Sequence, residues 1–189
     1  MKKVLRMTKI LTGNWLMVIC SVFYLAWWLI TFKPPAPKGN FIGTICLIGA
    51  FLTGLTGLFF TATGMTNDEE IVRSGIPGVV ILIAGMVMYA VLLLITRTLF
   101  HRQVTSELFI IVGWGVLEAA LCNYLYALGR FSVKEAFIYV AVILLAAIIS
   151  LICYVFYYEL PYVKGYIDGC IPLVLCMVVM VLLNLRIMR

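Results

Sequence analysis

Residues 136–158 read AFIYVAVILLAAIISLICYVFYY, a stretch without a single charged side chain. In an α-helix, about 20 apolar residues with a rise of 1.5 Å each cross the ~30 Å hydrocarbon core of a bilayer. A transmembrane β-strand would instead alternate apolar and polar residues over about 10 positions, and this stretch does not alternate. It therefore predicts a membrane-spanning α-helix.

Five further stretches share this character, so the sequence predicts an all-α integral membrane protein, a six-helix transmembrane bundle. The predicted spans cover residues 14–32, 41–64, 76–96, 108–128, 136–158 and 170–186. Composition agrees, because 65% of the 189 residues are hydrophobic and 12% are charged, whereas soluble domains hold about 45–50% apolar residues. The connectors are short, so residues 14–189 are expected to form a single transmembrane domain.

Residues 1–13 form a separate predicted segment at the membrane surface. Lys2, Lys3, Arg6 and Lys9 are interleaved there with apolar side chains, a composition typical of a helix that lies in the interface. Anionic lipid headgroups are its expected partner. The formal net charge of +6 arises from this segment and from basic residues beside the spans, so no nucleic-acid partner is expected.

Lys and Arg are unevenly divided between the two predicted sides of the membrane. Nine of the 14 fall on the side that holds both termini, and five fall on the opposite side, namely Lys33, Lys38, Arg97, Arg102 and Lys164. Positive charge accumulates on the cytoplasmic side of membrane proteins. We therefore expect both termini in the cytoplasm, in a cytoplasmic (inner or plasma) membrane.

The two halves of the predicted bundle, 14–96 and 108–186, can be aligned on each other. A shift of about 95 residues places Gly-Ile-Pro at 75–77 beside Cys-Ile-Pro at 170–172. Because each half holds three spans, a repeat would be inverted across the membrane, as in many transporters. The alignment predicts an inverted 3+3 helix repeat, and the alternative is that apolar segments match through composition alone.

Glu118 is the only acidic residue inside a predicted span, about 10 residues from the start of span 108–128. That distance corresponds to ~15 Å, close to the bilayer centre. Carboxyl groups at this depth are costly and usually face a cavity or a partner. At 100° per residue, Trp114 and Cys122 share its helix face, with Tyr126 at the margin. The predicted substrate-binding residues are Glu118, Trp114, Cys122, Tyr126 and, from the first span, Tyr24.

A second interpretation of Glu118 is structural. A buried carboxyl is readily protonated, and in that form it would fasten two helices through a hydrogen bond. Asn123 lies on a different face of the same span, and we expect its amide to hydrogen-bond a neighbouring helix.

Small residues recur four apart along span 41–64. They are Gly49, Thr53, Gly57 and Thr61, with Gly54 alongside. Small side chains let membrane helices approach closely. This face is therefore expected to pack against another helix of the chain or of a homo-oligomer.

The pattern favours transport of an unidentified small solute, by a channel, a transporter or the solute-binding membrane subunit of a larger one. No catalytic constellation or nucleotide-binding Gly-rich loop stands out, and His101 is the single histidine. Cofactors, metals and catalytic residues are therefore not expected. A non-catalytic membrane assembly partner is a further alternative, with the small-residue face of span 41–64 as its docking surface.

Cys20 and Cys122 give another alternative. They fall in the first and fourth spans, and a tyrosine follows each of them four residues later. In this respect the chain resembles the six-helix membrane thiol-disulfide relay proteins, which have an inverted three-plus-three layout and a reactive cysteine in each of these helices. The resemblance implies electron transfer through Cys20 and Cys122, although the proline beside each cysteine in that family is absent here.

Overall fold

The computed structural model describes residues 2–35, 39–65, 76–101, 105–157 and 159–189. All regular structure in these residues is helical, as predicted. Six helical stretches are long and apolar enough to cross a membrane, and they are Arg6–Thr31, Phe41–Met65, Val79–Thr98, Leu108–Ala127, Val133–Tyr157 and Tyr162–Met188. These properties of length and composition are those of a multi-pass integral membrane protein.

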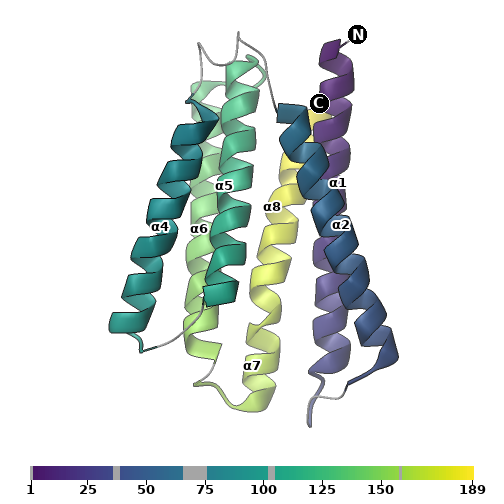
Figure 1. The fold of residues 1–189 in the computed structure, drawn as a ribbon, viewed down its shortest axis with the longest axis vertical. Coiled ribbons are helices and arrows are strands. Elements are labelled where there is room, and N and C mark those ends of the chain that lie inside the picture. Colours follow the sequence, from purple (N-terminus) through teal and green to yellow (C-terminus); the bar gives the residue numbers. More distant parts are fainter. Residues whose placement is uncertain (1, 36–38, 66–75, 102–104, 158) are drawn as a thin grey trace. The chain divides into compact units, whose positions relative to one another are not determined.

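The chain divides into two compact units, one of Met1–Thr66 with Glu159–Arg189 and one of Asn67–Tyr158. Unit 1 contains α1 (Lys2–Thr31), α2 (Phe41–Met65), α7 (Tyr162–Asp168) and α8 (Cys170–Met188), and unit 2 contains α4 (Gly78–Thr98), α5 (Thr105–Ala127) and α6 (Val133–Tyr157) (Figure 1). The inverted repeat of 14–96 and 108–186 stays a prediction.

In unit 1, α1 and α2 pack antiparallel along their whole length (Figure 1). α1 is one continuous helix, so nothing separates the basic segment 1–13 from the first predicted span. The buried residues of α2 are all small, namely Gly43, Ala50, Gly57, Thr61 and Gly64. Four of them recur every seven residues, the spacing that keeps one seam facing a partner helix in left-handed packing.

This buried seam differs in part from the small-residue face expected from the sequence. Gly57 and Thr61 lie in it, whereas Gly49, Thr53 and Gly54 are half-buried at its flank. Residues spaced four apart advance by 40° around the helix at each step, so they leave the contact face. The contact between two supercoiled helices repeats every 3.5 residues instead. The backbones touch at the centre of the seam, where a Cβ added to Gly57 would lie 2.8 Å from the carbonyl oxygen of Gly13.

The last predicted span, 170–186, is longer in the structure and is broken near its start. Pro172 cannot donate a hydrogen bond to the carbonyl four residues earlier, and its ring crowds that carbonyl. The helix accordingly divides into α7 and α8 at Gly169. Gly169 lies against the ring of Trp28, which a Cβ at this position would overlap.

α7 caps the end of α1 through its tyrosines. The hydroxyl groups of Tyr162 and Tyr166 donate to the carbonyl oxygens of Phe32 at 2.8 Å and Leu29 at 3.0 Å. In return, the indole nitrogen of Trp28 donates to the carbonyl oxygen of Tyr166 at 3.0 Å. Carbonyls in the last turn of a helix have no partner within it, so these bonds satisfy groups that would otherwise need water.

In unit 2, Asn123 of α5 holds the residue pair that precedes α4. Its side chain accepts from the backbone N–H of Ile76 at 3.0 Å and donates to the carbonyl oxygen of Ile76 at 2.8 Å. Pro77 follows as the N-cap of α4, where a missing N–H costs nothing. Asn123 thus hydrogen-bonds a residue that precedes α4, whereas the sequence led us to expect a partner within a neighbouring helix.

The connection from α5 to α6 contains two end-capping motifs that we did not predict. Gly129 has a positive φ of 71°, and the N–H of Arg130 bonds the carbonyl oxygen of Leu125 at 2.9 Å, the geometry of a glycine C-cap. Ser132 and Glu135 then bond each other's backbone N–H reciprocally. The Ser-x-x-Glu spacing at 132–135 is the sequence signal for this capping box.

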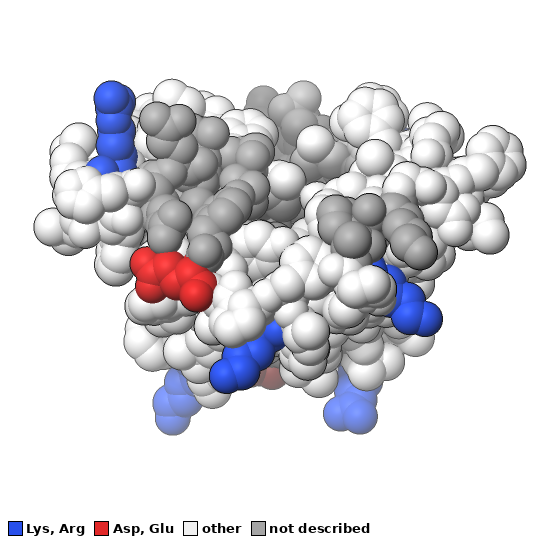
Figure 2. Space-filling view, turned by 90° about the horizontal axis from the view of Figure 1, so that it is seen from below, with Lys and Arg blue, Asp and Glu red and all other residues white. Residues whose placement is uncertain are grey.

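Charged side chains are scattered over the end of the molecule that Figure 2 shows. In the space-filling view of Figure 2, Lys, Arg, Asp and Glu occupy separate spots on a face that is otherwise largely white, apart from the residues drawn in grey. Many large apolar side chains are exposed as well, among them Phe41, Phe51, Phe59, Phe109 and Phe137. Such a surface suits lipid rather than water as its surroundings.

Gly57→Ala is expected to destabilise unit 1 by about 1–3 kcal/mol, the usual cost of overpacking. The added methyl group would force the backbones of α1 and α2 apart. The free energy of unfolding, measured in mixed micelles with a rising fraction of sodium dodecyl sulfate, checks this. Gly49→Ala is the matched control, because its Cβ would meet only the ring of Phe23 at 3.4 Å. Equal losses for the two variants would contradict the prediction.

Candidate functional site

α5 is the helix that positions the candidate site, since it packs against both α4 and α6. Half of the most apolar 18-residue stretch of α5 is buried, whereas a third or less of the corresponding stretch is buried in each of the other five candidate spans. Glu118 lies 10 residues after Leu108 and nine before Ala127, so it is about 15 Å and 14 Å from the two ends of this span. Its side chain is only 1% exposed.

Trp114 and Cys122 lie one turn before and one turn after Glu118 on the same face of α5. They are 7% and 0% exposed, respectively. The indole nitrogen of Trp114 is buried and has no hydrogen-bond partner among the described residues. One helix face therefore carries a buried carboxyl, a buried N–H donor and a buried thiol within two turns.

The other two predicted site residues, Tyr126 and Tyr24, are not part of this buried group on α5. Tyr126 is 38% exposed, and its place at the margin of the Glu118 face stays a prediction. Tyr24 belongs to unit 1, where its ring lies 5.0 Å from that of Trp27. A position of Tyr24 opposite Glu118 stays a prediction.

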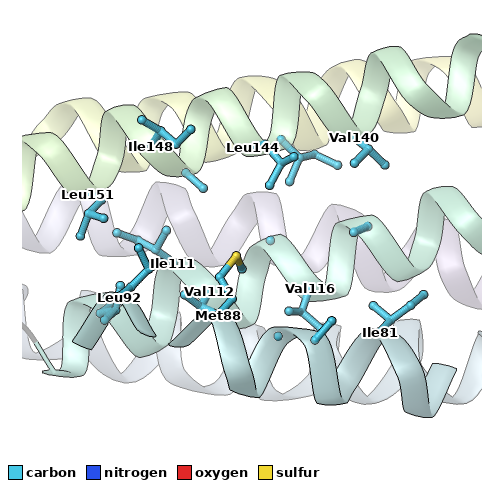
Figure 3. A pocket seen from close by; sticks show the side chains of 17 residues that line it. Ile81, Met88, Leu92, Ile111, Val112, Val116, Val140, Leu144, Ile148 and Leu151 are labelled. Carbon is cyan, nitrogen blue, oxygen red and sulfur yellow. The ribbon is translucent and has the colours of Figure 1, made fainter. Parts of the chain in front are cut away.

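A second feature of unit 2 is an apolar groove of about 320 Å³ between α4, α5 and α6. Figure 3 shows Met88, Val116 and Leu144 pointing into it from the three helices. Small residues line part of it, namely Ala84, Gly85, Gly115, Ala119 and Ala147. Glu118 is not among the lining residues. Because the lining offers apolar side chains alone, the groove suits hydrocarbon, and the polar chemistry of α5 lies on the neighbouring face.

Metal sites and reactive thiols each require a particular arrangement of His, Cys, Asp and Glu side chains. The described ranges contain no group of three or more His, Cys, Asp and Glu side chains that could hold a metal ion. None of the six cysteines forms a disulfide in the structure, and Cys122 is fully buried, while Cys20 is half-buried. Reactive thiols are usually partly exposed and lie close to positive charge.

Two buried polar residues of unit 1 were not among the predicted site residues. Asn14 in α1 and Asn184 in α8 are 1% and 0% exposed. The sequence signal that could have identified them is an amide side chain inside an apolar run. Membrane helices seldom direct such an amide toward lipid. The same signal did identify Asn123.

The chain matches no protein-family model, no curated protein and no solved structure.

Glu118→Lys is expected to cost about 3 kcal/mol, the price of a charged side chain at the centre of a bilayer on insertion scales. Glu118→Gln keeps the shape and the hydrogen bonding, and should stay within about 1 kcal/mol of the parent protein. Unfolding in mixed micelles again measures both. Glu159→Lys, at an exposed position, is the control. A Glu118→Lys variant as stable as this control would show that water reaches the site.

Proposed function

We propose that this chain is a multi-pass membrane transport protein, as a channel, a transporter or a solute-binding membrane subunit, with Glu118 as its central binding group. The single observation that carries the proposal is a carboxyl that is 1% exposed in the middle of a membrane-length helix. Ionisable groups at that depth are rare and mark solute, ion or proton pathways.

The neighbours of Glu118 indicate which solutes such a site would take. A carboxyl can bind a proton, a cation or a hydrogen-bond donor. The indole N–H of Trp114, which has no hydrogen-bond partner among the described residues, can donate to an acceptor. The face of a tryptophan ring also attracts cations. A proton, a small cation or a small polar solute that carries a donor fits this pair best.

The orientation and the repeat are part of the same proposal. We place both termini in the cytoplasm, because nine of 14 Lys and Arg residues belong to that side and positive charge favours it. An even number of spans supports termini on one side. The inverted 3+3 repeat of 14–96 and 108–186 rests on the alignment of the two proline-containing helix starts.

The structure offers less support for the two alternative functions, a thiol electron carrier and a non-catalytic assembly partner, than for transport. A thiol electron carrier would need Cys122 to reach a partner thiol, and this side chain has no exposed surface. A non-catalytic assembly partner was expected to dock through the small residues of α2, and α1 already occupies that seam. Electron transfer that is lost in Cys20→Ser and Cys122→Ser would restore the first alternative.

Glu118→Gln is expected to lower proton flux into proteoliposomes at least tenfold, because the amide cannot release a proton. The flux is followed with a pH-sensitive dye inside the vesicles after an acid pulse, with and without a K⁺ gradient. Glu159→Gln makes the same chemical change at an exposed residue and should leave the flux unchanged. A folded Glu118→Gln protein with full flux would refute the assignment.

Modification by a membrane-permeant carbodiimide gives a second test that does not depend on the identity of the solute. The reagent attaches covalently to protonated carboxyl groups in apolar surroundings. We expect a single modified residue inside the spans, Glu118, found by mass mapping, and none in Glu118→Gln. An unmodified Glu118 in the folded protein would contradict a site that opens to lipid or to a cavity.

A further inference from the structure

Unit 2 contains an open space that its own side chains do not fill. The apolar groove between α4, α5 and α6 has a volume of about 320 Å³, whereas small-molecule sites usually measure about 300–1,000 Å³. Packed protein interiors leave few voids larger than a water molecule. The groove is therefore much larger than a packing defect and has the size of a small binding site.

Glycine and alanine residues create this space. Gly85 of α4 packs directly on α5, since a Cβ added there would overlap the side chain of Val116. Gly115 of α5 also lines the groove, but an added Cβ would meet only the side chain of Ile143, at 3.9 Å. Three alanines are among the other lining residues. α4 is thus held close to α5 at one point, while small side chains leave room beside that contact.

The groove runs along the helices for about half the thickness of a membrane. Its lining extends from Ile81 to Leu92 on α4 and from Leu108 to Ala119 on α5. Each separation is 11 residues, or about 16 Å, whereas the hydrocarbon core is ~30 Å thick. Leu108 is also the first residue of the α5 span. The groove therefore has the length of one leaflet and begins at the end of that span next to the α4–α5 connection.

The lining of the groove selects hydrocarbon as the occupant. All 17 lining residues are aliphatic, methionine or glycine, so their side chains offer no hydrogen bond and no charge. The rim is open, because Leu144 and Ile148 of α6 are 47% and 55% exposed, and Figure 3 shows both beside the groove. Lipid chains rather than water surround a membrane protein at this depth. The groove is therefore continuous with the lipid-facing surface of unit 2.

We propose that the groove between α4, α5 and α6 binds one acyl chain of a membrane lipid, from the leaflet on the side of the α4–α5 connection. The chain and the groove agree in chemistry and in length. Three helices contact such a chain at once, so it stays bound longer than lipids on the outer faces of α4 and α6, because dispersion contacts add up over many atom pairs. Glu118 does not line the groove, so the site goes beyond the proposed transport function and does not depend on it.

Photo-crosslinking of the full chain in liposomes tests the proposal. The probe is a phosphatidylcholine that carries a diazirine in the middle of one acyl chain, and mass mapping finds the labelled residues. Met88 points into the groove (Figure 3), whereas Met86 on the same helix is 60% exposed and does not line it. We expect Met88 to be labelled at least as strongly as Met86. Weaker labelling of Met88 than of Met86, which exposure alone predicts, would overturn the proposal.

Gly115→Leu and Gly113→Leu form a matched pair of variants on α5. A Cβ has room at both positions, since nothing lies within 4 Å of a Cβ added to Gly113, but only Gly115 lines the groove. The side chain introduced by Gly115→Leu would fill the groove, so we expect labelling of Met88 to fall at least fivefold while that of Met86 stays the same. Gly113→Leu should change neither. Undiminished labelling of Met88 in folded Gly115→Leu protein would refute the site.

Ala147→Leu fills the same groove from α6 and should give the same loss of labelling if Gly115→Leu does not fold. A second copy of the chain is the competing occupant, and the oligomeric state measured by sedimentation in detergent identifies it. In that case the parent protein would be an oligomer without label on Met88, and Gly115→Leu would dissociate it. This result would assign the groove to an interface between copies and would overturn the lipid site.

Discussion

The constraint on which this structure depends is that a backbone in hydrocarbon has to satisfy its own hydrogen bonds. Helices do so internally everywhere except at their ends. The elements of this chain are accordingly long helices, and 65% of its residues are hydrophobic. Every polar group that departs from this pattern carries a free-energy cost, so each one marks a place where the structure has a specific task.

Some of these polar side chains form hydrogen bonds with backbone groups at the ends of helices. Asn123 bonds the backbone of Ile76 before α4, and Tyr162 and Tyr166 bond the last carbonyls of α1. Ser132 and Glu135 close the start of α6. These contacts satisfy backbone groups that a soluble protein can leave to water at the same positions.

Buried polar groups remain in both units when these helix-end contacts are set aside. In unit 2, Glu118 shares a buried face of α5 with Trp114, next to a groove that offers only apolar side chains. In unit 1, the side chains of Asn14, Thr61 and Asn184 are buried, and Thr61 lies at the glycine seam of α1 and α2. A carboxyl suits charge or proton binding.

The sequence by itself determined the six membrane-length helices, the place of Glu118 near mid-span and the face it shares with Trp114 and Cys122, because these follow from helix length and from 100° per residue. Only the tertiary structure decided that the seam of α2 repeats every seven residues, that α1, α2 and α8 form one unit, and that Asn14, Thr61 and Asn184 are buried. Those features depend on contacts between helices distant in the chain, and apolar sequences of similar composition do not encode which helix meets which.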